Sequence, residues 1–227
     1  MSLWSRIAEA LSALARGESL SEVFDRLRSP PERSVAFAIA VIALGAKMAK
    51  ADGRVTRDEV RAFREVFAVP PEEEANAARV FDLARQDVAG FDLYARRIAR
   101  MFGPGDPVLE NLLEGLFHIA LADGALDPRE AAFLQEVAEI FGIPPSRFAC
   151  LRAEFLPDSP ADPYDVLAVD RDAPMPEVRA AWARAVKENH PDRLIARGVP
   201  AEAVGLAERR LVAVNAAWEA IRRDRAA

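Results

Sequence analysis

Apolar residues recur along this chain at steps of three and four, the spacing that places them on one face of a helix. In the first 30 residues this stripe consists of Leu3, Trp4, Ile7, Leu11 and Leu14. A denser apolar run, residues 35–46, ends at Lys47 and is shorter than the roughly 20 residues of a membrane span, so it predicts a buried core helix. Alanine is abundant, and β-branched and aromatic residues are modest in number. The chain is therefore predicted to be all-α.

The amphipathic segment over residues 1–30 has two possible resting places, the protein's own core and a membrane surface. Its stripe is apolar enough for either, but Arg6 and Arg16 balance Glu9 and Glu18 up to residue 18. Anionic lipid therefore has little to attract, and packing on the protein's own core is favoured.

One pattern occurs twice between residues 31 and 150. An apolar helix, an Ala-Asp-Gly turn, an amphipathic helix and a Pro-Pro stop appear around residues 51–53 and again around residues 122–124. The prolines at 70–71 and 144–145 end each copy, since proline cannot continue a helix. The repeat predicts a helical hairpin used twice, packed into one bundle.

The two Asp-Gly turns have two interpretations. Thr56 with Glu59, and Asp127 with Glu130, have the spacing of a capping box, which begins a helix. The alternative is a divalent cation, because such ions need several converging oxygen ligands. Its candidate ligands are Asp52, Asp58, Glu59, Asp123, Asp127 and Glu130. The loops lack the alternating ligands of an EF-hand, so capping is favoured and neither a metal nor a cofactor is assigned.

A proline-rich segment over residues 151–162 is predicted to be a linker to a compact helical unit over residues 163–227. Two amphipathic helices, over residues 176–189 and from about residue 204 to 221, are joined by a loop and are expected to pack antiparallel. The first of them separates an apolar stripe from a basic one, and His190-Pro191-Asp192 follows it directly.

This tripeptide has four interpretations. It can be a simple helix stop, because a residue before proline is disfavoured in the α conformation. It can be a catalytic His–Asp pair, but no nucleophile or oxyanion hole accompanies it. A metal site is equally weak, since His118 is the only other histidine. The fourth interpretation is recognition by a protein partner.

Two resemblances bear on these choices. The paired Ala-Asp-Gly turns make residues 31–150 similar to the TerB-like domain of tellurite resistance, which implies a helical fold and a suspected metal-binding or stress-related role. Residues 163–223 resemble a J-domain of the DnaJ type through Pro163-Tyr164-Asp165-Val166-Leu167, the basic helix and His190-Pro191-Asp192. A TerB-like domain before a J-domain resembles the DjlA group of bacterial co-chaperones.

The J-domain resemblance implies a DnaK-type ATP-dependent chaperone of the 70-kilodalton heat-shock class as the partner, whose ATP hydrolysis is stimulated. The implied partner-binding residues are His190, Pro191 and Asp192 for the stimulation, and Arg179, Arg184, Lys187 and Arg193 for a basic docking face. Ala183 stands where many J-domains have a lysine, and Trp182 and Trp218 replace the usual tyrosines.

Charge and cysteine content narrow the function further. The chain has 30 Lys and Arg against 36 Asp and Glu, a formal charge of −6, so it is a poor candidate for general nucleic-acid binding. Its one cysteine, Cys150, excludes an internal disulfide and a DnaJ-type zinc domain. With no signal peptide and no membrane span predicted, we expect a cytoplasmic co-chaperone that is not itself an enzyme and whose client is unknown. The alternative is a metal-binding stress-response scaffold in which the J-like unit is only an interaction domain.

Overall fold

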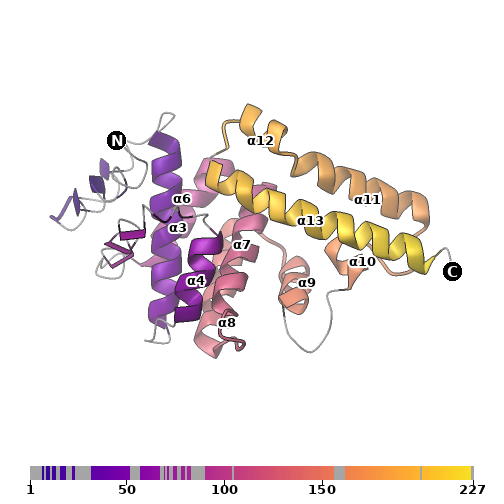
Figure 1. The fold of residues 1–227 in the computed structure, drawn as a ribbon, viewed down its shortest axis with the longest axis horizontal. Coiled ribbons are helices and arrows are strands. Elements are labelled where there is room, and N and C mark those ends of the chain that lie inside the picture. The colour runs from indigo at the N-terminus through magenta and orange to yellow at the C-terminus, as the bar shows by residue number, and fades with distance from the viewer. Residues whose placement is uncertain are drawn as a thin grey trace.

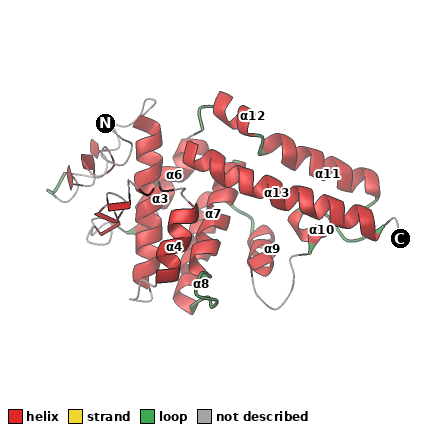
Figure 2. Ribbon diagram, in the orientation of Figure 1, coloured by secondary structure: helices red, strands yellow, loops and turns green. Residues whose placement is uncertain are grey.

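The fold is described by a computed structural model. It covers residues 32–51, 57–66, 90–103, 105–155, 162–199 and 201–225, with scattered positions between 7 and 23 and between 69 and 82. Within these ranges the regular elements are helices and no strand occurs (Figure 2), so the predicted all-α class is confirmed. No helix in this part of the chain has the length and apolarity that crossing a lipid bilayer requires.

The duplicated pattern forms two helical hairpins. Helices α3 (Glu32–Ala51) and α4 (Arg57–Val66) make the first, and α7 (Pro107–Ala120) and α8 (Pro128–Phe141) make the second. Helix α6 (Phe91–Phe102) packs against α3 and α8, and the five helices gather into one bundle (Figure 1). Their shared core includes the apolar run of α3, which is buried from residue 36 to residue 46, with Gly45 at its contact with Phe63 of α4.

The N-terminal segment contributes Ile7 to this core. Ile7 is fully buried and belongs to the bundle's apolar cluster, as expected for a segment that packs on the protein itself. The other members of the predicted stripe, Leu3, Trp4, Leu11 and Leu14, lie outside the described residues.

Polar caps begin the helices of the second hairpin. The Asp127 carboxylate accepts a hydrogen bond from Arg129 N at 2.8 Å, and Glu130 Oε2 accepts one from Asp127 N at 3.0 Å. The predicted capping box at this turn is therefore confirmed, and it satisfies backbone donors that a helix start leaves unpaired. The first-copy residues Asp52 and Thr56 lie outside the described residues.

The C-terminal unit is an antiparallel helix pair with a short helix against it. Helix α11 (Met175–Glu188) lies beside α13 (Ala201–Asp224), and α10 (Pro163–Val166) packs on α13 (Figure 1). The rings of Trp182 and Trp218 stack with centroids 5.1 Å apart, and Trp182 Nε1 donates to Asn215 Oδ1 at 2.9 Å. The tryptophans thus stabilise the helix pair through the apolar area of their stacked rings and through a hydrogen bond.

Helix α13 belongs to two apolar cores at once. Its C-terminal half, with Val214 and Ile221, packs against α11 and α10. Its N-terminal half, with Ala203 and Leu206, lies in the core of the bundle against α7. Gly115 of α7 permits this approach, because a Cβ there would lie 3.1 Å from Leu206 Cδ2.

The segment predicted as a linker begins within a helix. Helix α9 (Pro145–Phe155) continues to Phe155, so the start of the segment predicted as a linker, residues 151–155, is helical, and Leu151 is fully buried. Residues 156–161 lie outside the described residues. The predicted domain boundaries stay a prediction, but the bundle's core extends past residue 163 to include part of α13.

Candidate partner-binding site

The His-Pro-Asp corner connects α11 to the short helix α12 (Pro191–Ala196). His190 is the N-cap of α12: its backbone is extended, with φ −67° and ψ 126°, and its Nδ1 accepts a hydrogen bond from Asp192 N at 3.3 Å. Pro191 takes the first helical position, where its missing N–H costs nothing. The tripeptide is therefore more than a helix stop, since His190 closes the corner on the backbone of Asp192.

The same corner is open to solvent. The side chain of His190 is 53% exposed and that of Asp192 is 90% exposed. Asp192 Oδ2 lies 4.0 Å from His190 Nδ1, beyond hydrogen-bond distance, so both carboxylate oxygens remain accessible to a partner.

The four basic residues predicted for docking are all exposed, on the two helices that the corner joins. Arg179, Arg184 and Lys187 lie on α11, and Arg193 lies on α12, where its Nη1 is 3.5 Å from the Lys187 carbonyl oxygen. Among the residues that the structure describes, none of the four forms an ion pair. Their charge is therefore available to an acidic surface on another molecule.

The residues that flank the corner are fixed to the bundle. Asn111 Nδ2, on α7, donates to Asn189 Oδ1 at 2.8 Å, and both asparagines are buried. After the corner, Leu194 is fully buried in the bundle's core. Arg197 forms an ion pair with Asp106, the N-cap of α7. The corner is exposed, whereas its two sides are anchored.

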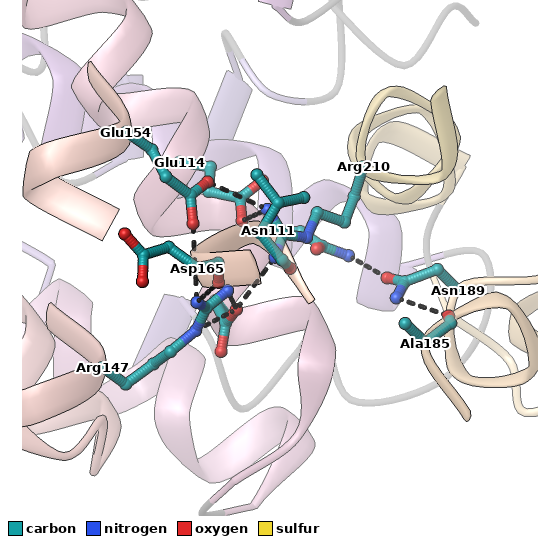
Figure 3. A network of polar contacts seen from close by, with 10 residues as sticks. Asn111, Glu114, Arg147, Glu154, Asp165, Ala185, Asn189 and Arg210 are labelled. Carbon is teal, nitrogen blue, oxygen red and sulfur yellow. Dashed lines mark hydrogen bonds and ion pairs between the residues drawn. The ribbon is translucent and has the colours of Figure 1, made fainter. Parts of the chain in front are cut away.

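A buried ionic network joins α7 and α9 of the bundle to α10 and α13 (Figure 3). Arg210 of α13 donates to Glu154 Oε2 at 3.2 Å and to the Val166 carbonyl at 2.7 Å. Arg147 of α9 donates from Nε to Glu110 Oε1 at 2.9 Å and from Nη1 to the Asp165 carbonyl at 3.0 Å. The sequence did not predict this network, although Arg210 interrupts an apolar helix face.

The network holds more acidic than basic side chains. Among the described residues it contains two arginines and three glutamates. Glu114 Oε1 lies 3.0 Å from Arg210 Nη1, but it is buried and no hydrogen bond is aligned to it. Burial is the main cause that raises the pKa of Glu114 to about 7, and Arg210 opposes it, while Glu110 and Glu154 reinforce it. Burial also raises the pKa of Glu154.

The acidic residues considered as metal ligands have partners in the protein itself at the described positions that follow. Asp58 pairs with the Arg61 side chain at 2.6 Å. Asp123 accepts from Ala125 N at 3.2 Å, and Asp127 and Glu130 form the capping box. In the described part of the chain, no group of three or more His, Cys, Asp and Glu side chains is arranged to hold a metal ion. Asp52 lies outside that part.

Comparisons with known proteins agree with both resemblances. The family model "Tellurite resistance protein TerB" matches residues 38–153. The Co-chaperone protein DjlA of Coxiella burnetii is 30% identical over 200 residues, which cover 78% of this chain and 73% of that protein. The chain belongs to the DjlA family. Further DjlA relatives are those of Photobacterium profundum, 27% identical over 86% of this chain and 79% of that protein, and Shewanella oneidensis, 27% identical over 92% and 84%. No solved structure matches the chain.

Membership in the DjlA family helps to choose between a recognition site and a simple helix stop at the corner. The relatives are named co-chaperones, and the aligned regions extend over most of each chain rather than over the TerB part alone. The interpretation of the corner as a recognition site is therefore favoured over a simple helix stop.

Proposed function

We propose that this protein is a co-chaperone that recruits a DnaK-type heat-shock 70 kDa chaperone and stimulates its ATP hydrolysis through His190, Pro191 and Asp192. The observation that carries the proposal is the exposed corner between α11 and α12, with unpaired basic side chains beside it. The naming of the DjlA relatives as co-chaperones supports it. ATP is hydrolysed by the partner and not by this chain.

Each residue of the corner has a separate task in this proposal. Pro191 fixes the backbone, and His190 holds Asp192 N, so the Asp192 carboxylate projects from a set position. An arginine of the partner can bind that carboxylate with two parallel hydrogen bonds. Because this contact is formed by one exposed carboxylate, a rigid backbone is needed to direct it.

The basic face guides the encounter. Exposed ion pairs contribute only about 0 to 1 kcal/mol each, so Arg179, Arg184, Lys187 and Arg193 steer and orient a transient complex instead of holding it tightly. The attraction is screened over about 8 Å at physiological ionic strength, so recruitment weakens as salt rises.

The TerB bundle supplies the specificity for a client or a signal in this proposal, and the complex forms in the cytoplasm, where the partner chaperone acts. The bundle also carries the helix α7 that anchors the corner. Client selection and stimulation are therefore assigned to parts of one connected structure.

The test is the steady-state ATPase rate of a purified DnaK-type chaperone as this protein is added. We expect wild type to stimulate hydrolysis and His190→Gln to abolish the stimulation. The matched control is His118→Gln, which changes the exposed histidine of α7. If wild type does not stimulate, or if His190→Gln stimulates equally, the proposal is wrong.

A second measurement separates docking from stimulation. Replacing Arg184 and Lys187 by alanine should raise the concentration needed for half-maximal stimulation while the maximal rate is kept, because steering charges are lost and the corner is intact. Replacing Arg100 of α6 and Arg152 of α9 by alanine, two exposed changes that remove the same total charge, serves as the control.

A further inference from the structure

The residues on both sides of the His-Pro-Asp corner are held by helix α7, which lies outside the predicted J-domain (residues 163–227). Asn189 precedes the corner and is 5% exposed, and Leu194 follows it and is fully buried. Between them, His190 and Asp192 stay open to solvent. A corner that is exposed in its middle and fixed at both ends has a defined direction.

The first tie is a buried hydrogen bond between two asparagines 78 residues apart. Asn111 Nδ2 donates to Asn189 Oδ1 at 2.8 Å. The Asn189 carboxamide also donates from Nδ2 to the Ala185 carbonyl oxygen at 2.9 Å, in the last turn of α11. Its two ends therefore connect the end of α11 to α7. Because buried carboxamides are costly to leave unpaired, this bond fixes one orientation of the residue before His190.

The second tie lies after the corner and reaches the same helix. Arg197, the C-cap of α12, forms an ion pair with Asp106. Asp106 is itself held, since its Oδ1 accepts from Val108 N at 3.1 Å as the N-cap of α7. Asp106 and Asn111 belong to the first two turns of one helix, so the corner and α7 are joined at two points.

We infer that Asn111, acting through Asn189, is a positioning residue that sets the direction of the His-Pro-Asp corner for the partner chaperone. This inference rests on the proposed co-chaperone function. The TerB bundle then does more than select a client: its helix α7 is part of the apparatus that presents the corner. Because the corner already has its direction before the partner binds, less conformational entropy is lost when the complex forms.

The effect on stimulation has a definite form. Losing one hydrogen bond of ordinary strength lowers the equilibrium constant between the competent direction and all others about fivefold. We expect Asn111→Ala to lower the maximal ATPase stimulation, with about fivefold as the largest effect. The concentration for half-maximal stimulation should stay within about twofold of wild type, because the basic docking face is unchanged.

The experiment titrates the full-length chain into the DnaK-type chaperone and separates maximal stimulation from half-saturation. Wild type, Asn111→Ala, Asn189→Ala and the double variant are compared, and the double variant should lose no more than either single one. Asp127→Ala is the stability control, since it removes the N-cap of α8 in the same bundle and should keep wild-type stimulation.

A surface variant keeps the test valid if the buried asparagines prove necessary for folding. Arg197→Ala breaks the second tie at a side chain that is 41% exposed, and it should also lower the maximum without moving half-saturation. If wild type stimulates and these variants match it, or if they change only half-saturation, the inference is overturned while the proposed function stands. If wild type itself gives no stimulation, the proposed function fails first.

Discussion

Glu114→Gln should make the protein more stable at pH 8, although it removes a charge from a salt-bridge network. Glu114 lies on α7 with its side chain 14% exposed, 3.0 Å from Arg210. Because the network holds three glutamates against two arginines, protonation of this carboxyl balances the buried charge. Glutamine imitates the protonated form at every pH.

The magnitude follows from the two pKa values. An ordinary glutamate has a value of 4.5, and burial raises the pKa of Glu114 to about 7. The folded state therefore binds this proton more tightly than the unfolded state. The stability that the proton provides is complete below pH 4.5 and is lost as the pH rises through about 7. Linkage gives a loss of about 2.5 kcal/mol between pH 5 and pH 8.

The assay is urea denaturation followed by circular dichroism at pH 5 and pH 8, for wild type and Glu114→Gln. The free energy of unfolding of the variant minus that of wild type should grow by about 2.5 kcal/mol from the lower to the higher pH. Because the two proteins share all other titrating groups, the contributions of those groups cancel in this difference. Glu136→Gln, an exposed change on α8, should give a difference that varies by less than about 0.5 kcal/mol. A constant difference for Glu114→Gln across this range would refute the reasoning.

Three further changes test how the two halves are joined, each measured as the free energy of unfolding. Arg210→Ala leaves buried glutamates without their cation and should lower it by about 3–5 kcal/mol, whereas an effect under about 1 kcal/mol would mean that the network is solvated. Leu194→Ala should lower it by about 2–5 kcal/mol, while its 63%-exposed neighbour Ile195→Ala should change it by less than about 0.5 kcal/mol; equal effects contradict the described packing. Gly115→Val pushes α13 away from α7 and should cost about 1–3 kcal/mol, and an unchanged value would place α13 elsewhere.

Local patterns in the sequence were sufficient for the helices and for the exposed corner. The spacing of apolar residues indicated both hairpins, and Asp127 with Glu130 indicated the start of α8, because caps and periodicity depend on neighbours within a few residues. The exposure of His190 and Asp192 also agrees with their expected place between two amphipathic helices. The sequence left the physical role of His190 open, and the hydrogen bond from Asp192 N supplies one.

The contacts between the two halves could not be predicted from local sequence patterns. Asn111 and Asn189 are 78 residues apart, and nothing in either neighbourhood indicates the other. Arg210 interrupts the apolar face of α13, but its partners on α7 and α9 come from distant parts of the chain. A weak signal was present in α13, whose apolar face continues through Ala203, Leu206 and Ala207, outside the half that packs on α11. An apolar face of this length needs more than one partner.

The double membership of α13 restricts how this protein can be rearranged by recombination. A J-unit cut out at residue 163 would carry Leu194, Ala203 and Leu206 as bare apolar surface, and the remaining bundle would lose the helix that covers Gly115. Neither piece can therefore be moved into another protein without exposing apolar surface. A change in α7 must be matched in α13, so the two halves are constrained to evolve together.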